Sequence, residues 1–165
     1  MKLTSSTAIP PIRIAVLGCG DHAAWALTRI KEGLGFCALL TESALDQRWS
    51  EHTAGACEAA SRSACPSMAV SAAQDGIEFL KRNQVDVIVL AGTRWILPAS
   101  FVSAFNGQII NLHPSKLPQH RGAGVFSWQI LNDVREATLS AYWVEEGIDD
   151  GPLLFQLRDD EARGL

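Results

Sequence analysis

The sequence predicts an α/β fold: an open, three-layer, Rossmann-like arrangement in which helices cover both faces of a mostly parallel, twisted sheet. Short apolar runs alternate with segments of helical periodicity along the 165 residues, a pattern typical of parallel sheets with crossover helices. Val85–Leu90 is apolar at nearly every position, which favours a strand covered on both faces. The turn Gly18-Cys19-Gly20 joins the first apolar run to a helical segment, as in the first turn of such folds.

Seven short apolar runs predict the strands. They are rich in aliphatic residues and too short for helices. They cover Ile12–Leu17, Phe36–Leu40, Ser67–Val70, Val85–Leu90, Ile109–Leu112, Leu139–Val144 and Pro152–Gln156.

Five segments with helical character predict the helices. They cover His22–Lys31, Leu45–Ala60, Ser71–Asn83, Pro98–Phe105 and Gly124–Asn132. Asp21 is a candidate cap for the first helix, which Gly33 and Gly35 end, and Pro98 suits the first turn of the fourth helix.

The composition limits the classes of protein to which the chain can belong. With 47% apolar and 19% charged residues, it is that of an ordinary globular protein, and we expect residues 1–165 to form one domain. The net charge of −4 disfavours a strongly basic surface, so nucleic acid is not an expected partner. The amino end has no apolar leader core, and no apolar run reaches roughly 18 residues, so we expect a cytoplasmic protein without membrane contact. The sequence carries no signal for the oligomeric state.

The cysteines give no sign of a disulfide framework or of a metal site. They are Cys19, Cys37, Cys57 and Cys65, and they form neither a C-x-x-C pair nor a zinc-like spacing with the histidines. A chain of this length can build its own core without disulfides. We therefore expect reduced cysteines and no bound metal.

Three polar side chains form a candidate acyl-transfer set. Asn111 and His113 stand two apart at the end of an apolar run, so a strand projects them to one face. Asp149 lies in a glycine-flanked turn after the next run. Groups just past strand ends are expected to meet at the carboxyl edge of an open α/β sheet. Each also has a structural alternative, since Asn and Asp are common in turns and a histidine can be an ordinary satisfied polar residue.

The loop that leaves the strongest strand is unusual for a simple connector. It carries Arg94, Trp95, Ile96 and Leu97. Apolar groups with a cation suit a flat heteroaromatic ligand that bears acidic groups. The alternative is that the apolar side chains only cap the core.

The first turn also fits a dinucleotide fingerprint. Gly18-Cys19-Gly20-Asp21-His22-Ala23 reads G-x-G-x-x-A between a strand and a helix, and Glu42 lies near the position of a ribose-binding acid. A substrate-phosphate site or a purely structural turn remains open, because any tight turn of this kind can select glycines.

Several motifs gather in the second half of the chain. Asn111–Pro118 reads N-x-H-P-S-x-L-P, and Asp149-Asp150-Gly151 reads D-x-G. Leu90-Ala91-Gly92, Ile96-Leu97-Pro98 and Arg121-Gly122 accompany them. From Leu90 onward the chain resembles the formyltransferase family that uses 10-formyltetrahydrofolate, whose members act on glycinamide ribonucleotide, methionyl-tRNA, amino sugars and carrier-bound substrates.

The resemblance implies an N-formyltransferase that moves a formyl group from 10-formyltetrahydrofolate to a primary amine of a small molecule or of a carrier-bound substrate. It implies that Asn111, His113 and Asp149 are catalytic, because each falls on the matching motif position. It also implies a folate pocket, with no metal, lined by Leu90, Gly92, Arg94, Trp95, Ile96, Leu97, Ile148 and Asp150.

The sequence departs from the family pattern in three further respects. Asp21 would repel a phosphate at the first turn, which disfavours glycinamide ribonucleotide as the acceptor. Tyr142 stands where some relatives have His. The chain stops soon after the last motif, where family domains usually continue, so Leu165 is a candidate truncation point. Two alternatives remain: a formyltetrahydrofolate hydrolase on the same site, and a non-catalytic folate- or dinucleotide-binding module.

Overall fold

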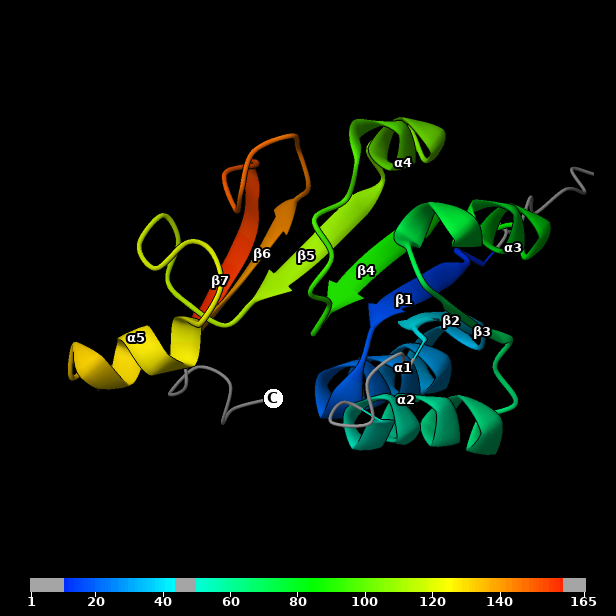
Figure 1. The fold of residues 1–165 in the computed structure, drawn as a ribbon, viewed down its shortest axis with the longest axis horizontal. Helices are drawn as coiled ribbons and strands as arrows, with labels where there is room; N and C mark the ends of the chain where they lie inside the picture. Colours follow the sequence, from blue (N-terminus) through cyan, green and yellow to red (C-terminus); the bar gives the residue numbers. More distant parts are fainter. Residues whose placement is uncertain (1–10, 44–49, 159–165) are drawn as a thin grey trace, which may run out of the picture.

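A seven-stranded sheet forms the centre of the computed structural model, which describes residues 11–43 and 50–158, with the side chains of residues 50–53 excluded (Figure 1). The strand order is β3-β2-β1-β4-β5-β6-β7. The strands are β1 (Ile14–Gly18), β2 (Cys37–Glu42), β3 (Ser67–Val70), β4 (Val87–Ala91), β5 (Ile109–His113), β6 (Thr138–Trp143) and β7 (Leu153–Arg158). Strands β1 to β5 pair in parallel, and β6 runs antiparallel to both neighbours. The prediction of a mostly parallel sheet is confirmed.

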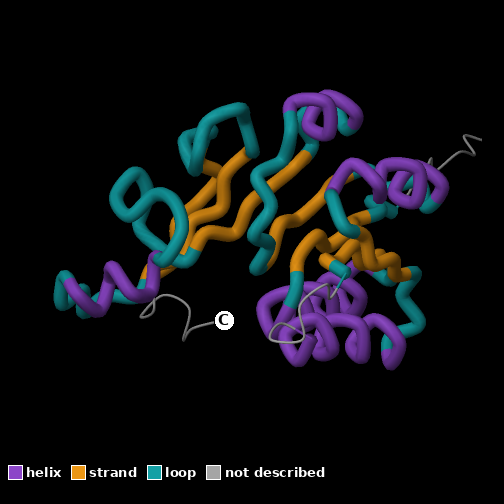
Figure 2. Tube along the Cα trace, viewed as in Figure 1, coloured by secondary structure: helices purple, strands orange, loops and turns teal. Residues whose placement is uncertain are grey.

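Helices cover both faces of the sheet, also as predicted (Figure 2). They are α1 (Gly20–Leu34), α2 (Ser50–Arg62), the 3-10 helix η2 (Ala73–Gly76), α3 (Ile77–Arg82), α4 (Ala99–Ala104) and α5 (Val125–Leu131). None of the helices in the described ranges is long and apolar enough to cross a membrane.

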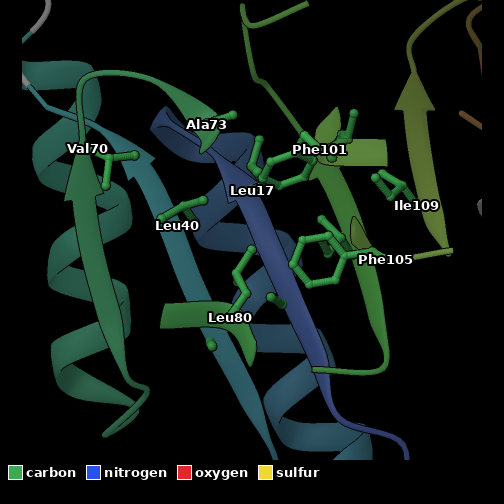
Figure 3. Packing of buried hydrophobic residues seen from close by; sticks show 12 residues of the cluster. Leu17, Leu40, Val70, Ala73, Leu80, Phe101, Phe105 and Ile109 are labelled. Carbon is green, nitrogen blue, oxygen red and sulfur yellow. The ribbon is translucent and has the colours of Figure 1, made fainter. Parts of the chain in front are cut away.

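The core has two parts because successive residues of a strand point to opposite faces. On β1, Ala15 and Leu17 pack beside Leu80 of α3 and Phe101 of α4 on one face, which Figure 3 shows from close by. Val16 packs on the other face, with residues of α1 and α2. We call these the α4 face and the α1 face. The first part of the sheet is thus closed on both sides, as its nearly continuous apolar strands predict.

Three local predictions were wrong. Gly33 does not end α1, which continues to Leu34 and is capped by Gly35. The segment Ser71–Asn83 is not one helix: it starts as η2, where the Asp75 carboxylate accepts the N–H of Ala72 at 3.3 Å, and only then continues as α3. Asp21 does not cap α1. The cap position is Cys19, with extended backbone and no side-chain hydrogen bond, and Asp21 lies in the first turn instead. There its charge still faces the positive end of the helix dipole.

Candidate active site

Strand β5 carries Asn111 and His113 on the α4 face of the sheet. Both share that face with Ile109, a fully buried core residue, because they stand two and four positions further along the strand. Strand β6 lies alongside in antiparallel register and places Tyr142 directly opposite Asn111. Directly opposed residues of an antiparallel pair lie on the same face. Pairing of β5 with β6 therefore brings the amide, the imidazole and the phenol together.

Asp149 reaches this face by a route that differs from the expected one. Because β6 is antiparallel, its carboxyl end lies beside the amino end of β5, where Val144 N–H donates to Ile109 O at 2.8 Å. The following loop must fold back across the sheet to bring Asp149 to His113. The expectation that a shared carboxyl edge gathers all three groups was wrong in this respect, although the three do meet.

The folded-back loop is held by close backbone contacts. The N–H of Gly122 donates to Asp149 Oδ2 at 2.7 Å. A Cβ at Gly151 would lie 1.8 Å from Trp143 O, so only glycine lets the loop pass over β6 there. Asp149 itself has φ +50, in the left-handed region, which costs a non-glycine residue about 1–2 kcal/mol. Residues held in this region often cluster at functional sites.

Two hydrogen bonds and one longer contact connect the side chains into one chain of groups. Asn111 Nδ2 donates to Tyr142 Oη at 2.7 Å, and Tyr142 Oη donates to Asp149 Oδ1 at 2.5 Å. The other carboxylate oxygen, Oδ2, lies 3.6 Å from His113 Nδ1. The side chains of His113 and Asp149 are only 7% and 13% exposed. The three predicted residues are thus joined, with Tyr142 as the link that the sequence-based prediction did not include.

The surroundings of His113 restrict where its protons can be. Its Nε2 lies 2.9 Å from the backbone oxygen of His120. A carbonyl oxygen only accepts, so Nε2 must carry a hydrogen. Nδ1 lies 3.6 Å from Asp149 Oδ2, which is beyond hydrogen-bond distance. The Asp149 charge still lies close enough to act on the ring electrostatically.

A second set of buried groups fixes the loop that follows β5. Ser140 Oγ donates to Ser115 O at 2.5 Å and accepts from Leu117 N–H at 3.2 Å. Gln156 Nε2 donates to Leu117 O and to Ser140 Oγ, each at 2.9 Å. Ser115 Oγ in turn lies 3.3 Å from His120 O, the partner of His113. The serine of the N-x-H-P-S motif thus supports the histidine indirectly.

The electrostatics of Tyr142 follow from its position. Burial raises the pKa of the phenol, and the Asp149 carboxylate raises it further, whereas the bond from Asn111 lowers it. The net rise keeps the hydroxyl protonated across the neutral range. Tyr142 can therefore act as a permanent donor to Asp149.

The end of β4 and the loop between β4 and α4 contain six of the predicted folate-pocket residues, in contrasting environments. Leu90 is only 4% exposed and belongs to the core, which Trp95 and Leu97 flank, whereas Ile96 is 80% exposed. Gly92 has φ +70, and a Cβ there would lie 2.9 Å from Cys19 O. The guanidinium of Arg94 is bound by Glu42 at 2.5 Å. Gly92 thus places this loop against the first glycine turn.

The remaining two predicted pocket residues lie in the loop between β6 and β7. Ile148 is 58% exposed. Asp150 lines a shallow depression of about 450 Å³ between α4 and this loop. Its other lining residues are Val102, Gly107, Val144, Glu145, Glu146 and Gly147. A cavity of this size is within the range of small-molecule sites.

The sequence is similar to those of known formyl transferases. The family model for formyl transferases matches residues 39–160. The methionyl-tRNA formyltransferase of Chlorobium chlorochromatii is 31% identical over 153 residues, which are 88% of this chain and 48% of that protein. The phosphoribosylglycinamide formyltransferase of Bacillus subtilis is 35% identical over 80 residues, 48% of this chain and 41% of that protein. The chain thus spans less than half the length of these two relatives.

Solved structures show the same fold. The phosphoribosylglycinamide formyltransferase of Streptococcus pneumoniae superposes with a TM-score of 0.75 at 24% identity, covering 89% of this chain and 81% of that one. A formyltetrahydrofolate deformylase of Pseudomonas syringae gives 0.72 at 19% identity, covering 89% of this chain and 50% of that one. The family model covers well over half of the sequence, and the chain therefore belongs to the formyl transferase family.

Proposed function

We propose that this chain is an N-formyltransferase that moves a formyl group from 10-formyltetrahydrofolate to a primary amine of a small molecule or of a carrier-bound substrate. The observation that carries the proposal is the connected set Asn111–Tyr142–Asp149–His113, whose contacts are given above. It combines N–H donors with a shielded carboxylate on one face of the sheet. These are the groups that acyl transfer to an amine needs.

The reaction places two demands on the site. A neutral amine attacks the formyl carbon, the formyl oxygen becomes an oxyanion, and the folate nitrogen leaves with a proton. The amide nitrogen of Asn111 has two hydrogens and gives one to Tyr142, so the second is available to the oxyanion. Asp149 beside His113 stabilises a charged ring, and it passes the proton that the attacking amine loses to the leaving folate nitrogen, directly or through water.

We place the folate between the flanking loops. The depression beside Asp150 has three acidic side chains in or beside its wall, Glu145, Glu146 and Asp150. Carboxylates accept hydrogen bonds, and the ring system of a folate presents N–H donors at its edge. The apolar stretch Trp95–Leu97 borders the same face of the sheet. We assign the ring to this depression and the formyl group to the side that faces Asn111.

The test is product analysis with purified protein. The protein is mixed with 10-formyltetrahydrofolate and a panel of primary amines, and formylated amine, tetrahydrofolate and free formate are measured separately. The proposal expects tetrahydrofolate to form in step with formylated amine and only in its presence. Formate release without any amine would instead identify a hydrolase. Tight binding of a dinucleotide without any folate binding would contradict both.

A further inference from the structure

The hydroxyl of Tyr142 lies between two groups that do not touch each other directly. It accepts from Asn111 Nδ2 at 2.7 Å and donates to Asp149 Oδ1 at 2.5 Å. The residue is 4% exposed, so little water competes for these bonds. Opposite pairing of Asn111 and Tyr142 on neighbouring strands sets the first contact. A shift in the pairing of β6 with β7 next to Tyr142 marks the kind of irregularity that redirects a side chain.

The chemistry of the three groups fixes the direction of both bonds. An ionised carboxylate only accepts, so the single hydroxyl hydrogen of Tyr142 must point to Asp149. The hydroxyl then has only lone pairs left for Asn111. The amide must therefore turn its NH₂ toward Tyr142 and its oxygen away. The acid thus determines the orientation of an amide to which it is not bonded.

We propose that Tyr142 is a positioning residue that holds the Asn111 amide with its nitrogen toward the reacting group. The Tyr142 hydroxyl gives its hydrogen to Asp149, and it can therefore only accept a hydrogen bond from Asn111. The inference rests on the proposed function, because it assigns Tyr142 a part in the same reaction. It also divides the work of Asp149 between its two oxygens: Oδ1 orients Asn111 through Tyr142, while Oδ2 serves Gly122 and His113.

The orientation matters because the two ends of an amide have nearly the same shape and opposite polarity. A developing oxyanion needs an N–H from Asn111 and would be repelled by the amide oxygen. Without a neighbour that only accepts, the amide can turn over at little steric cost, as the similarity of its oxygen and nitrogen ends implies. The Tyr142 hydroxyl excludes the reversed orientation of the Asn111 amide before the substrate binds.

The kinetic test compares three variants. Tyr142→Phe keeps the ring and removes the hydroxyl, and we expect kcat to fall about tenfold to a hundredfold, the scale of a misplaced catalytic group, with little change in KM for the folate. Tyr142→His should recover part of the loss, because a neutral imidazole has one donor and one acceptor and can pass on the same polarity. Trp143→Phe is the matched control, since it changes the next aromatic of β6, on the opposite face, and should leave kcat unaltered.

A purely structural role for Tyr142 predicts another outcome. Tyr142→Phe would then lower the thermal stability while kcat per folded molecule stayed at the wild-type value, and Tyr142→His would recover nothing. That result would overturn the proposal. Absence of transfer to every amine by the wild-type protein would instead overturn the proposed function, and the orientation of Asn111 would then be decided by a measurement that needs no turnover.

That measurement uses the fact that Tyr142 is the single tyrosine of the chain. Protein labelled with ¹³C at the tyrosine Cζ gives one signal, and we expect it to shift in Asp149→Asn and in Asn111→Ala but not in Trp143→Phe. The side-chain NH₂ signals of Asn111 should move in Tyr142→Phe. The proposal would be refuted by a tyrosine signal that is the same in Asp149→Asn and wild type. It would also be refuted by Asn111 signals that do not change when the hydroxyl is removed in Tyr142→Phe.

Discussion

Glu42, the last residue of β2, holds Arg94 at two points across the sheet. Its Oε2 accepts from the Arg94 guanidinium at 2.5 Å, and its Oε1 accepts from the Arg94 backbone N–H at 3.3 Å. The side chain of Glu42 is 13% exposed and that of Arg94 52%. The carboxylate that the dinucleotide alternative would assign to a ribose therefore binds the chain itself, which disfavours that alternative. The contact also ties the loop between β4 and α4 to β2, from which β4 is separated by β1.

Loss of this contact should loosen the loop more than the fold. We expect Glu42→Ala to weaken binding of a folate analogue about threefold to tenfold, while thermal stability changes little, since a half-exposed ion pair contributes roughly 0–1 kcal/mol. Glu42→Gln keeps an oxygen for the Arg94 N–H and should bind folate better than Glu42→Ala. Calorimetric titration of both variants measures the difference, and equal affinity in wild type and Glu42→Ala would show that the contact does not shape the pocket.

His113 and Asp149 should affect turnover far more than folate binding. We expect His113→Ala and Asp149→Asn each to lower kcat by roughly a hundredfold or more, because they remove charge stabilisation from the transition state. The double variant should be hardly worse than either single variant, since residues that act as a unit are non-additive. Asp133→Asn, which changes a carboxylate that is 74% exposed, is the control. Wild-type turnover in either single variant would refute the assigned roles.

Two glycines should respond to alanine in opposite directions. At Gly18, where β1 runs beside β4, a Cβ would lie 1.9 Å from Ala91 O, a backbone atom that cannot move aside. We expect Gly18→Ala to cost about 1–3 kcal/mol or more of unfolding free energy. Gly33 lies in α1 with nothing within 4 Å of the added Cβ, so Gly33→Ala should stabilise by about 0.5–1 kcal/mol. Urea unfolding of the two variants tests this, and stabilisation by Gly18→Ala would contradict the close approach of the strands.

The protein should lose stability in alkali through Cys37. Burial raises the pKa of this thiol from its usual 9.0 to about 12, with Cys65 adding to the rise. The folded state therefore keeps a proton that the unfolded chain releases. The full contribution of the Cys37 thiol to the free energy of unfolding is present below pH 9, and it is lost as the pH rises toward 12.

Between pH 9 and 12, the Cys37 thiol alone should lower the free energy of unfolding by about 1.4 kcal/mol per pH unit. Tyr142 acts in the same direction above pH 10, because its folded-state pKa is also raised above the usual 10.0. Urea midpoints measured under reducing conditions from pH 8 to pH 11 should fall, and should fall less steeply in Cys37→Ala. An identical slope in both proteins would exclude Cys37 as the cause.

Local patterns were sufficient for much of the fold. Ser67–Val70 was predicted with the bounds that β3 has, and β5 extends only one residue past its predicted end at Leu112. Both segments are runs too short for a helix, and run length and residue type are local properties of the sequence. The segment predicted as one helix at Ser71–Asn83 begins as the 3-10 turn η2, at whose end Gly76 packs against Leu40, whose side chain would lie 2.4 Å from an added Cβ. That contact joins distant parts of the chain and leaves no periodic signal.

The sequence by itself determined the class of fold, the family and the spacing that puts Asn111 and His113 on one face, because strand periodicity needs only neighbouring residues. Tertiary structure alone decided that β6 runs antiparallel to β5, that Tyr142 therefore stands opposite Asn111, and that Asp149 returns over the sheet to meet them both. The physical reason is that the register between β5 and β6 depends on how the whole sheet packs. A slip of one residue would send Tyr142 to the other face.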